Sequence, residues 1–155
     1  MKQEAAKALS ELLGKMGLAA EVVAEEHPDH IALEVRGPET GLVVGKRGAT
    51  LEAIQYLVNK LVPAGEEGAE RQGARRPDKP IYVDAEGYRE RRAEQLRELA
   101  QQLAEKARGS KRPVRADAMS PADRRVVHLA LADSADIATR SEGEGADRRL
   151  VVFLK

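Results

Sequence analysis

Residues 41–62, "GLVVGKRGATLEAIQYLVNKLV", place a Gly-Lys-Arg-Gly turn directly before an apolar-periodic segment. Such a turn can cradle a phosphate with backbone N–H groups, so the nucleotide P-loop is the first alternative to consider. That motif needs four residues between its glycines, and a Ser or Thr after the lysine to hold magnesium. Here three residues separate Gly41 from Gly45, and Arg47 stands where the hydroxyl is needed. The spacing argues against a nucleotide site, and the phosphate is expected to belong to another ligand.

The composition limits the classes of protein to consider. The chain has 155 residues, enough for one ordinary domain or two small ones. Aromatic residues make up 3% and Trp and Cys are absent, which excludes a disulfide framework and a Cys-ligated zinc site. No apolar run approaches the roughly 20 residues that span a bilayer. Residues 1–17 also lack the apolar region of a signal peptide. We therefore expect a cytoplasmic protein with no membrane span.

Hydrophobic spacing predicts a helix and a hairpin in the first part of the chain. Apolar residues recur at helical spacing over residues 5–16, and Gly14 or Gly17 can end that helix. Residues 18–26 and 30–37 read as two strands on either side of a Pro/Asp turn, which predicts an antiparallel hairpin. The two histidines of this turn, His27 and His30, are expected to be solvated, because no third metal ligand is near them.

The segment after the glycines predicts a second helix and a further strand. The helix carries apolar residues on one side: Leu51, Ile54, Leu57, Val58 and Leu61. Pro63 is expected to end it, residues 64–80 read as a polar linker, and residues 81–85 alternate like a strand. The predicted order is helix, strand, strand, short helix, Gly-x-x-Gly turn, helix and strand.

This order, with the Gly-x-x-Gly turn between two helices, resembles the KH nucleic-acid-binding domain in its type II, bacterial arrangement. The resemblance implies a clamp for about four nucleotides of single-stranded RNA or DNA, since glycines let a nucleic-acid backbone approach closely. The turn residues are Gly45, Lys46, Arg47 and Gly48, with the two basic side chains expected on phosphates. The residues expected to form the groove under the bases are Val43, Val44 and Ile54. The alternative is an ordinary glycine-bounded turn with two solvated basic residues.

A long charged helix is predicted next. Residues 86–108 carry Leu96, Leu99 and Leu103 on one stripe, and Gly109 and Ser110 can end the helix. Residues 86–115 hold nine basic and five acidic side chains, although the whole chain has a formal net charge of zero. The basic side chains at its start, Arg89, Arg91 and Arg92, are expected to be solvated rather than phosphate-bound.

The last forty residues predict a second small fold. Residues 113–119 read as a strand, and Ser120 and Pro121 are suited to the N-cap and first position of a helix. Arg124 and His128 stand four residues apart on that helix and so share one face. The residues expected to pack inward are Val126, Val127, Leu129 and Ala130. Residues 137–145 and 148–155 read as two strands around a Gly/Asp loop.

This block resembles the R-three-H domain, a single-stranded nucleic-acid-binding module named for its Arg-x-x-x-His signature. Arg124 and His128 match the signature, and Arg148 and Arg149 enter the final strand. An Arg fork and an imidazole one turn apart can hold a phosphate, or a phosphate and a base edge. The alternative is a surface Arg and His on an ordinary amphipathic helix.

Together the two blocks resemble the Jag, or SpoIIIJ-associated, protein family over nearly the whole chain. The resemblance implies an α+β protein of two small domains, a type II KH domain at 1–85 and an R-three-H domain with its connecting helix at 86–155. Family members often carry an additional N-terminal Jag domain, which is not expected here because the KH unit starts almost at Met1. Roles that depend on it, such as recruitment near the membrane, are not expected either.

We therefore predict a non-enzymatic protein that binds single-stranded RNA, with single-stranded DNA as an alternative ligand. The family resemblance implies post-transcriptional regulation, in some members tied to cell division and envelope growth, and a small separate KH protein as a partner. No cofactor, metal or small-molecule substrate is expected. The second hypothesis is a protein-interaction adaptor that docks on a ribosomal or cell-division partner, which the acidic first segment and the zero net charge favour slightly.

Overall fold

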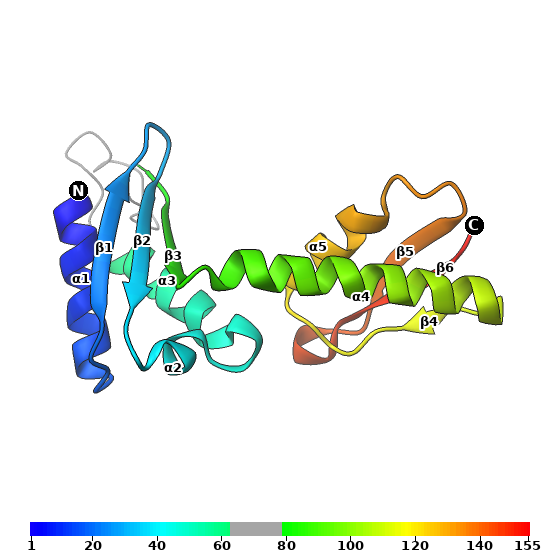
Figure 1. Cartoon of the computed structure of the whole chain (residues 1–155), viewed down its shortest axis with the longest axis horizontal. Helices are drawn as coiled ribbons and strands as arrows, with labels where there is room; N and C mark the ends of the chain where they lie inside the picture. Colours follow the sequence, from blue (N-terminus) through cyan, green and yellow to red (C-terminus); the bar gives the residue numbers. More distant parts are fainter. Residues whose placement is uncertain (63–78) are drawn as a thin grey trace. The chain divides into compact units, whose positions relative to one another are not determined.

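The computed structural model describes residues 1–62 and 79–155. It divides the chain into two compact units, Met1–Tyr88 and Arg89–Lys155 (Figure 1). Each unit combines helices with a three-stranded sheet, so the predicted α+β class is confirmed. The expected stop at Pro63 and most of the linker predicted at 64–80 lie outside the described residues.

The first unit has the predicted order of elements. They are α1 (Lys2–Lys15), β1 (Glu21–Glu26), β2 (Ile31–Arg36), α2 (Thr40–Val44), the 3-10 turn η1 (Lys46–Gly48), α3 (Ala49–Leu61) and β3 (Ile81–Ala85). The sheet order is β1-β2-β3, with β1 antiparallel and β3 parallel to β2. A parallel pair needs a crossover connection, and α2 and α3 lie in the segment that supplies it. The Gly-x-x-Gly turn therefore lies on the crossover.

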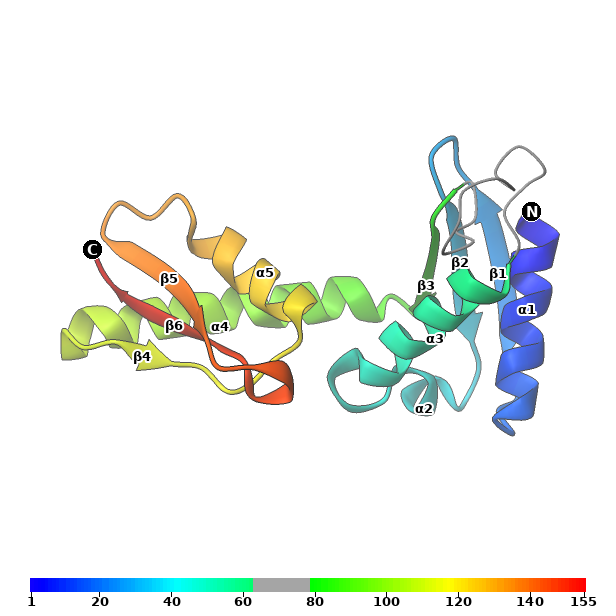
Figure 2. The same cartoon turned by 180° about the vertical axis from the view of Figure 1, so that it is seen from behind.

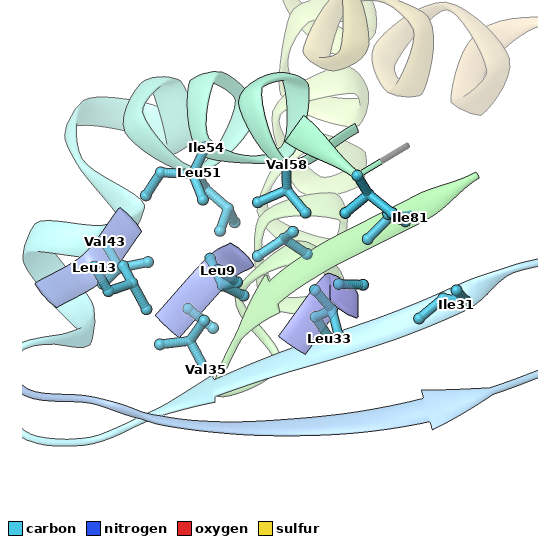
Figure 3. Packing of buried hydrophobic residues seen from close by; sticks show 14 residues of the cluster. Leu9, Leu13, Ile31, Leu33, Val35, Val43, Leu51, Ile54, Val58 and Ile81 are labelled. Carbon is cyan, nitrogen blue, oxygen red and sulfur yellow. The ribbon is translucent and has the colours of Figure 1, made fainter. Parts of the chain in front are cut away.

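One hydrophobic core holds the first unit together. Both α1 and α3 lie on the same face of the sheet (Figure 2), and their apolar side chains point toward the strands (Figure 3). Leu9 of α1, Leu33 of β2 and Val58 of α3 are 0–1% exposed in this cluster. The other face of β3 carries Tyr82, which is 50% exposed. The alternation of β3 thus separates a buried side from an accessible one.

Three apolar residues of the predicted core faces are on the surface instead. Leu57 and Leu61 are 43% and 58% exposed, and Met16 is 43% exposed. The predicted stripe on α3 was too wide, because the sheet covers only the sector that holds Leu51, Ile54 and Val58. Helix α1 runs through Gly14 and ends at Lys15, before Gly17, whose φ is +76°. Of the two predicted stops, Gly17 is therefore the better one.

The second unit packs two helices on an antiparallel sheet. Its elements are α4 (Tyr88–Ser110), which begins at the unit boundary, β4 (Val114–Arg115), α5 (Pro121–Leu131), β5 (Ile137–Glu142), the 3-10 turn η3 (Gly145–Asp147) and β6 (Arg149–Leu154). The sheet order is β4-β6-β5. Buried side chains include Leu96 and Leu103 of α4, Val127 of α5 and Val152 of β6. As predicted, Ser120 caps α5: its Oγ accepts a hydrogen bond from the N–H of Asp123 at 3.2 Å.

Several details of the second unit differ from the sequence predictions. The strand predicted at 113–119 is only two residues long, and α4 continues through Gly109 and Ser110 instead of ending before them. Leu129 is 55% exposed rather than packed inward. Arg92 is not solvated, because its Nη2 lies 2.7 Å from Oδ2 of the buried Asp123. This ion pair joins α4 to the first turn of α5.

Candidate nucleic-acid interface

The Gly-x-x-Gly turn requires its glycines for internal reasons. Gly45 has φ +69°, and a Cβ there would lie 2.1 Å from Oγ1 of Thr50. Gly48 is buried with φ +81°, and a Cβ there would lie 2.8 Å from Cε1 of Tyr88. The space left by the missing side chains is therefore filled by the chain's own Thr50 and Tyr88. The structure thus gives both glycines an internal reason, and the close approach of a nucleic-acid backbone at this turn stays a prediction.

The turn nevertheless presents a basic surface at a helix start. Lys46 and Arg47 are both exposed. Gly48 is the N-cap of α3 and has no side chain to accept a hydrogen bond from the first-turn N–H groups. These groups add positive potential at the place where the two basic side chains emerge. The turn can thus hold an anion through side chains and backbone together.

The apolar groove predicted beside this turn is not accessible. Val43 is 0% exposed and Ile54 is 2% exposed, because both pack in the core of the first unit (Figure 3). Val44 is partly buried against the same core. Val43 and Ile54 therefore cannot lie directly under bases, and the prediction for these two residues is wrong. They support the turn from inside.

An accessible cleft of about 560 Å³ lies instead between α3 and β3. Its lining residues are Glu52, Gln55, Tyr56, Asn59, Lys60, Pro80, Ile81 and Tyr82. Tyr56 is 63% exposed, and Lys60 Nζ lies 5.5 Å from the centre of its ring. The α3 residues recur every three or four positions from one turn after Gly48, so the cleft runs along the helix that starts at the basic turn. Helical spacing could have suggested this face, but not that β3 forms its other wall.

Two side-chain amides close the free edge of the sheet inside this cleft. The N–H of Ile81 donates to Oδ1 of Asn59 at 3.0 Å, and Nδ2 of Asn59 donates to the carbonyl of Ile81 at 2.7 Å. The N–H of Val83 donates to Oε1 of Gln55 at 2.9 Å. An edge strand with open N–H and C=O groups invites pairing with another chain. These amides satisfy that edge and fix α3 against β3.

The second unit brings Arg124 and His128 together as predicted. They lie one turn apart on α5, and Nη1 of Arg124 donates to the carbonyl of Met119 at 2.7 Å. Nδ1 of His128 is hydrogen-bonded to Oγ1 of Thr139 on β5. These contacts hold the two signature side chains against neighbouring elements. The helix face is therefore part of a surface built from α5 and β5.

A concave surface of about 470 Å³ surrounds the signature residues. Its lining residues are Pro121, Arg124, Arg125, His128, Thr139, Arg140, Ser141, Arg148 and Leu150. Among the described residues, four arginines and a histidine therefore line it, and no carboxylate does. Arg149, which was predicted with Arg148, is not among them, and its Nε donates to the carbonyl of Asp147 at 3.3 Å. We call this surface the arginine cleft.

Sequence reasoning missed Arg125, Arg140 and Ser141 of the arginine cleft. The guanidinium of Arg140 lies 4.9 Å from the centre of the Phe153 ring and donates to Glu142 Oε1 at 3.1 and 2.9 Å. The hydrogen bond from Arg140 lowers the pKa of Glu142, and Arg115 contributes in the same direction. The carboxylate thus stays ionised and, together with the Phe153 ring, holds the Arg140 guanidinium in place. Only strand pairing brings Arg140 near α5, so no local pattern could reveal it.

Family comparisons agree with this division of the chain. The model described as the KhpA/KhpB KH domain matches residues 2–70, and the model of the R-three-H domain matches residues 94–154. A protein of Clostridium symbiosum named RNA-binding protein KhpB is 32% identical over 157 residues, covering all of this chain and 67% of that relative. The chain belongs to the KhpB, or Jag, family. The resemblance predicted from the two motifs is thereby confirmed.

Two further KhpB relatives are more distant. Those of Bacillus subtilis (strain 168) and Lactiplantibacillus plantarum are 31% and 28% identical over 88% and 91% of the chain. The chain spans 67%, 62% and 41% of the length of these three KhpB proteins.

Over residues 1–62 and 79–155 of this KhpB-family chain, no helix is both long and apolar enough to cross a bilayer.

The histidines of the β1–β2 hairpin are more ordered than a solvated turn implies. The rings of His27 and His30 stack with centroids 4.3 Å apart, and His30 meets the ring of Tyr82 edge-on at 5.4 Å. Within the part of this KhpB-family chain that the structure describes, no group of three or more His, Cys, Asp or Glu side chains could hold a metal ion. The hairpin histidines therefore belong to a ring cluster beside the α3/β3 cleft.

Proposed function

We propose that this chain binds single-stranded RNA with both of its units and acts as a post-transcriptional regulator. The arginine cleft is the observation that carries the proposal. Four arginines, two from α5, one from β5 and one from the position before β6, line it together with His128, and folding alone gives no reason to gather like charges. Arginine forks match phosphate geometry. The names of the relatives, RNA-binding protein KhpB, support RNA as the source of the phosphates.

The first unit supplies the second contact with the strand. Lys46 and Arg47 hold phosphates at the start of α3, and bases enter the α3/β3 cleft that runs from this turn. Tyr56 and Tyr82 offer exposed ring surface there. They are two of only three tyrosines in a chain that has one phenylalanine. Base stacking on aromatic side chains tolerates many sequences, so this cleft suits a binder of single strands.

Binding without catalysis is the form of activity that we propose, acting in the cytoplasm. We propose a single-stranded ligand because stacking on the rings of the α3/β3 cleft requires bases that are not paired in a duplex. Single-stranded DNA offers the same phosphates and bases and is expected to compete, with weaker binding where a 2′-hydroxyl is contacted. A small separate KH protein is the partner that family membership suggests.

The neighbouring pair Arg148 and Arg149 offers a matched test. Arg148→Ala in the full chain should weaken RNA binding about 10- to 100-fold, since a hydrogen bond to a charged group is worth about 1.5–3 kcal/mol. Arg149→Ala, outside the arginine cleft, should bind nearly as the wild type. Fluorescence anisotropy with a labelled single-stranded RNA measures both. Equal affinities of the two variants, both folded, would contradict a phosphate role for the cleft.

The basic turn has its own test. Changing Lys46 and Arg47 to Asp removes two cations and adds two anions on an exposed turn, so RNA affinity should fall while the melting temperature hardly changes. The dependence of affinity on salt should also become shallower, because fewer phosphates are neutralised. Unchanged affinity of the folded variant at low salt would show that the turn is not a clamp.

A protein-interaction adaptor remains the second candidate function. The observation that favours it is the exposure of Leu57 and Leu61 on α3, with Leu42 62% exposed on α2. Apolar side chains of this size on a surface favour contact with another protein. The adaptor hypothesis predicts that the wild-type chain itself binds single-stranded RNA no better than a neutral protein does, so the same titration separates the two.

A further inference from the structure

Ring-bearing side chains are scarce in this chain, yet they gather in one place. The chain has three tyrosines, one phenylalanine, three histidines and no tryptophan. Four of these seven rings belong to the α3/β3 cleft or to the hairpin beside it: Tyr56, Tyr82, His27 and His30. Tyr56 and Tyr82 are 63% and 50% exposed, so the hydrophobic core does not account for them. The exposure of these rings in one place favours a ligand with flat faces.

The rings form a continuous series from the cleft to the tip of the hairpin. Tyr82 lines the cleft, its ring meets His30 edge-on with an interplanar angle of 69°, and His30 stacks on His27 at 17°. The series is held in place at the backbone. The N–H of His27 donates to the carbonyl of His30 at 2.8 Å, and Nζ of Lys79 donates to the carbonyl of His27 at 3.0 Å. The rings are thus preorganised before any ligand arrives.

The charges around the hairpin tip select bases rather than phosphates. Glu25 and Asp29 flank the two histidines, at 3.9 Å from His27 Nε2 and 2.7 Å from His30 Nδ1. The hydrogen bond from His30 lowers the pKa of Asp29, which stays ionised near neutral pH. Carboxylates repel a phosphate backbone, whereas a neutral base carries no net charge for them to repel. A strand can therefore turn its bases toward the rings and its phosphates toward the basic turn.

We propose that the bases of single-stranded RNA stack on one surface formed by Tyr56, Tyr82, His30 and His27. This proposal rests on the RNA binding proposed above. This surface extends the α3/β3 cleft to the tip of the β1–β2 hairpin. The first unit then holds more nucleotides than the roughly four that a Gly-x-x-Gly clamp accounts for. Tyrosine and histidine faces supply the stacking.

Ring-conserving substitutions separate stacking from other roles. In the full chain, Tyr82→Leu and the pair His27→Leu with His30→Leu remove rings, while Tyr82→Phe and the pair His27→Phe with His30→Phe keep them. The probes are oligouridylates of about four and about ten nucleotides, and a ten-unit ribose-phosphate chain without bases. We expect Tyr82→Leu to weaken binding of the ten-mer about tenfold, and Tyr82→Phe to stay close to the wild type.

The histidine pair tests how binding depends on the length of the RNA. The leucine pair should weaken the ten-mer several-fold and leave the four-mer unchanged, while the phenylalanine pair should bind both as the wild type does. None of the ring variants should change binding of the base-free chain, which offers phosphates only. Tyrosine fluorescence supplies an independent readout, because the chain has no tryptophan and a stacked base should quench it.

The result that overturns the stacking surface is specific. If folded Tyr82→Leu and the leucine pair bind the ten-mer as tightly as the wild type, while Lys46→Asp with Arg47→Asp does not, the rings do not stack on bases. RNA binding through the phosphate contacts of the basic turn and the arginine cleft then still stands. If the aspartate variant also keeps its affinity, the proposed role of the first unit fails as well. Should Tyr82→Leu not fold, Tyr56→Leu replaces it, because Tyr56 is the most exposed of the four rings and is expected to show the same loss.

Discussion

Gly48→Ala is expected to damage the Gly-x-x-Gly turn through the chain's own packing, before any ligand is involved. At φ +81° an alanine costs about 1–2 kcal/mol relative to glycine. Its Cβ would also lie 2.8 Å from Cε1 of Tyr88, and forced overpacking typically costs about 1–3 kcal/mol. The combined destabilisation is about 3 kcal/mol, which lowers the melting temperature of a unit of this size by about 12–24 °C.

The assay is urea unfolding followed by circular dichroism, with Gly41→Ala as a matched control. Gly41 lies in α2 and has no positive φ, and among the described residues no atom lies within 4 Å of a Cβ placed there. Alanine at this position should therefore be neutral or stabilise by up to about 1 kcal/mol. Tyr88→Leu removes the ring that the new methyl group meets. In that background Gly48→Ala should cost about 1–3 kcal/mol less, leaving the cost of the positive φ.

Two results would refute this reasoning. If Gly48→Ala and Gly41→Ala unfold at the same urea concentration as the wild type, the positive φ and the close ring do not constrain the turn. If the costs of Gly48→Ala and Tyr88→Leu simply add, the two residues are not in contact. In the first case the glycine would be explained by a ligand, and in the second by its positive φ without Tyr88.

Further predictions follow from other contacts. Asp123→Ala leaves Arg92, whose side chain is 21% exposed, without the carboxylate that binds it. The variant should lower the stability of the second unit by about 2–3 kcal/mol, measured by urea unfolding. A loss below about 0.5 kcal/mol would contradict the role of this ion pair in joining α4 to α5. The hydrogen bond from Arg108 lowers the pKa of Asp136, so its stabilisation exists above the unfolded pKa and is lost as pH falls. The stability difference between the wild type and Arg108→Ala should therefore be present above about pH 5 and vanish below about pH 3, and a constant difference would refute the assignment. Oligonucleotides long enough to reach both units should bind more tightly than short ones through effective concentration, and Arg124→Ala with His128→Ala should abolish that gain in anisotropy titrations.

Much of the fold could be predicted from local sequence patterns. The order of helices and strands follows from apolar periods of 3.6 and 2, and the hairpin and the capped start of α5 follow from turn and cap residues. The basic turn and the Arg-x-x-x-His pair are also local, since residues one helical turn apart must share a face. These features need no knowledge of distant contacts.

The tertiary structure alone decides which faces are covered and which residues meet. Leu57 has the same apolar character as Val58, yet only Val58 faces the sheet. Ile54 is in the core because the sheet lies over it, whereas Tyr82 is 50% exposed because it points to the other side of β3. Periodicity relates residues within one element and contains no information about the partner of that element.

The candidate sites show the same division. Lys46, Arg47, Arg124 and His128 could be found in the sequence, because each pair lies within one local segment. Arg140 joins Arg124 only when β5 lies beside α5, and Tyr82 joins Tyr56 only when β3 lies beside α3. The two residues of each pair are 16 or more positions apart in the sequence. Their proximity therefore depends on how the elements pack and not on any local spacing. Local spacing is therefore enough to find the two motifs, whereas the clefts around them form only when distant segments pack together.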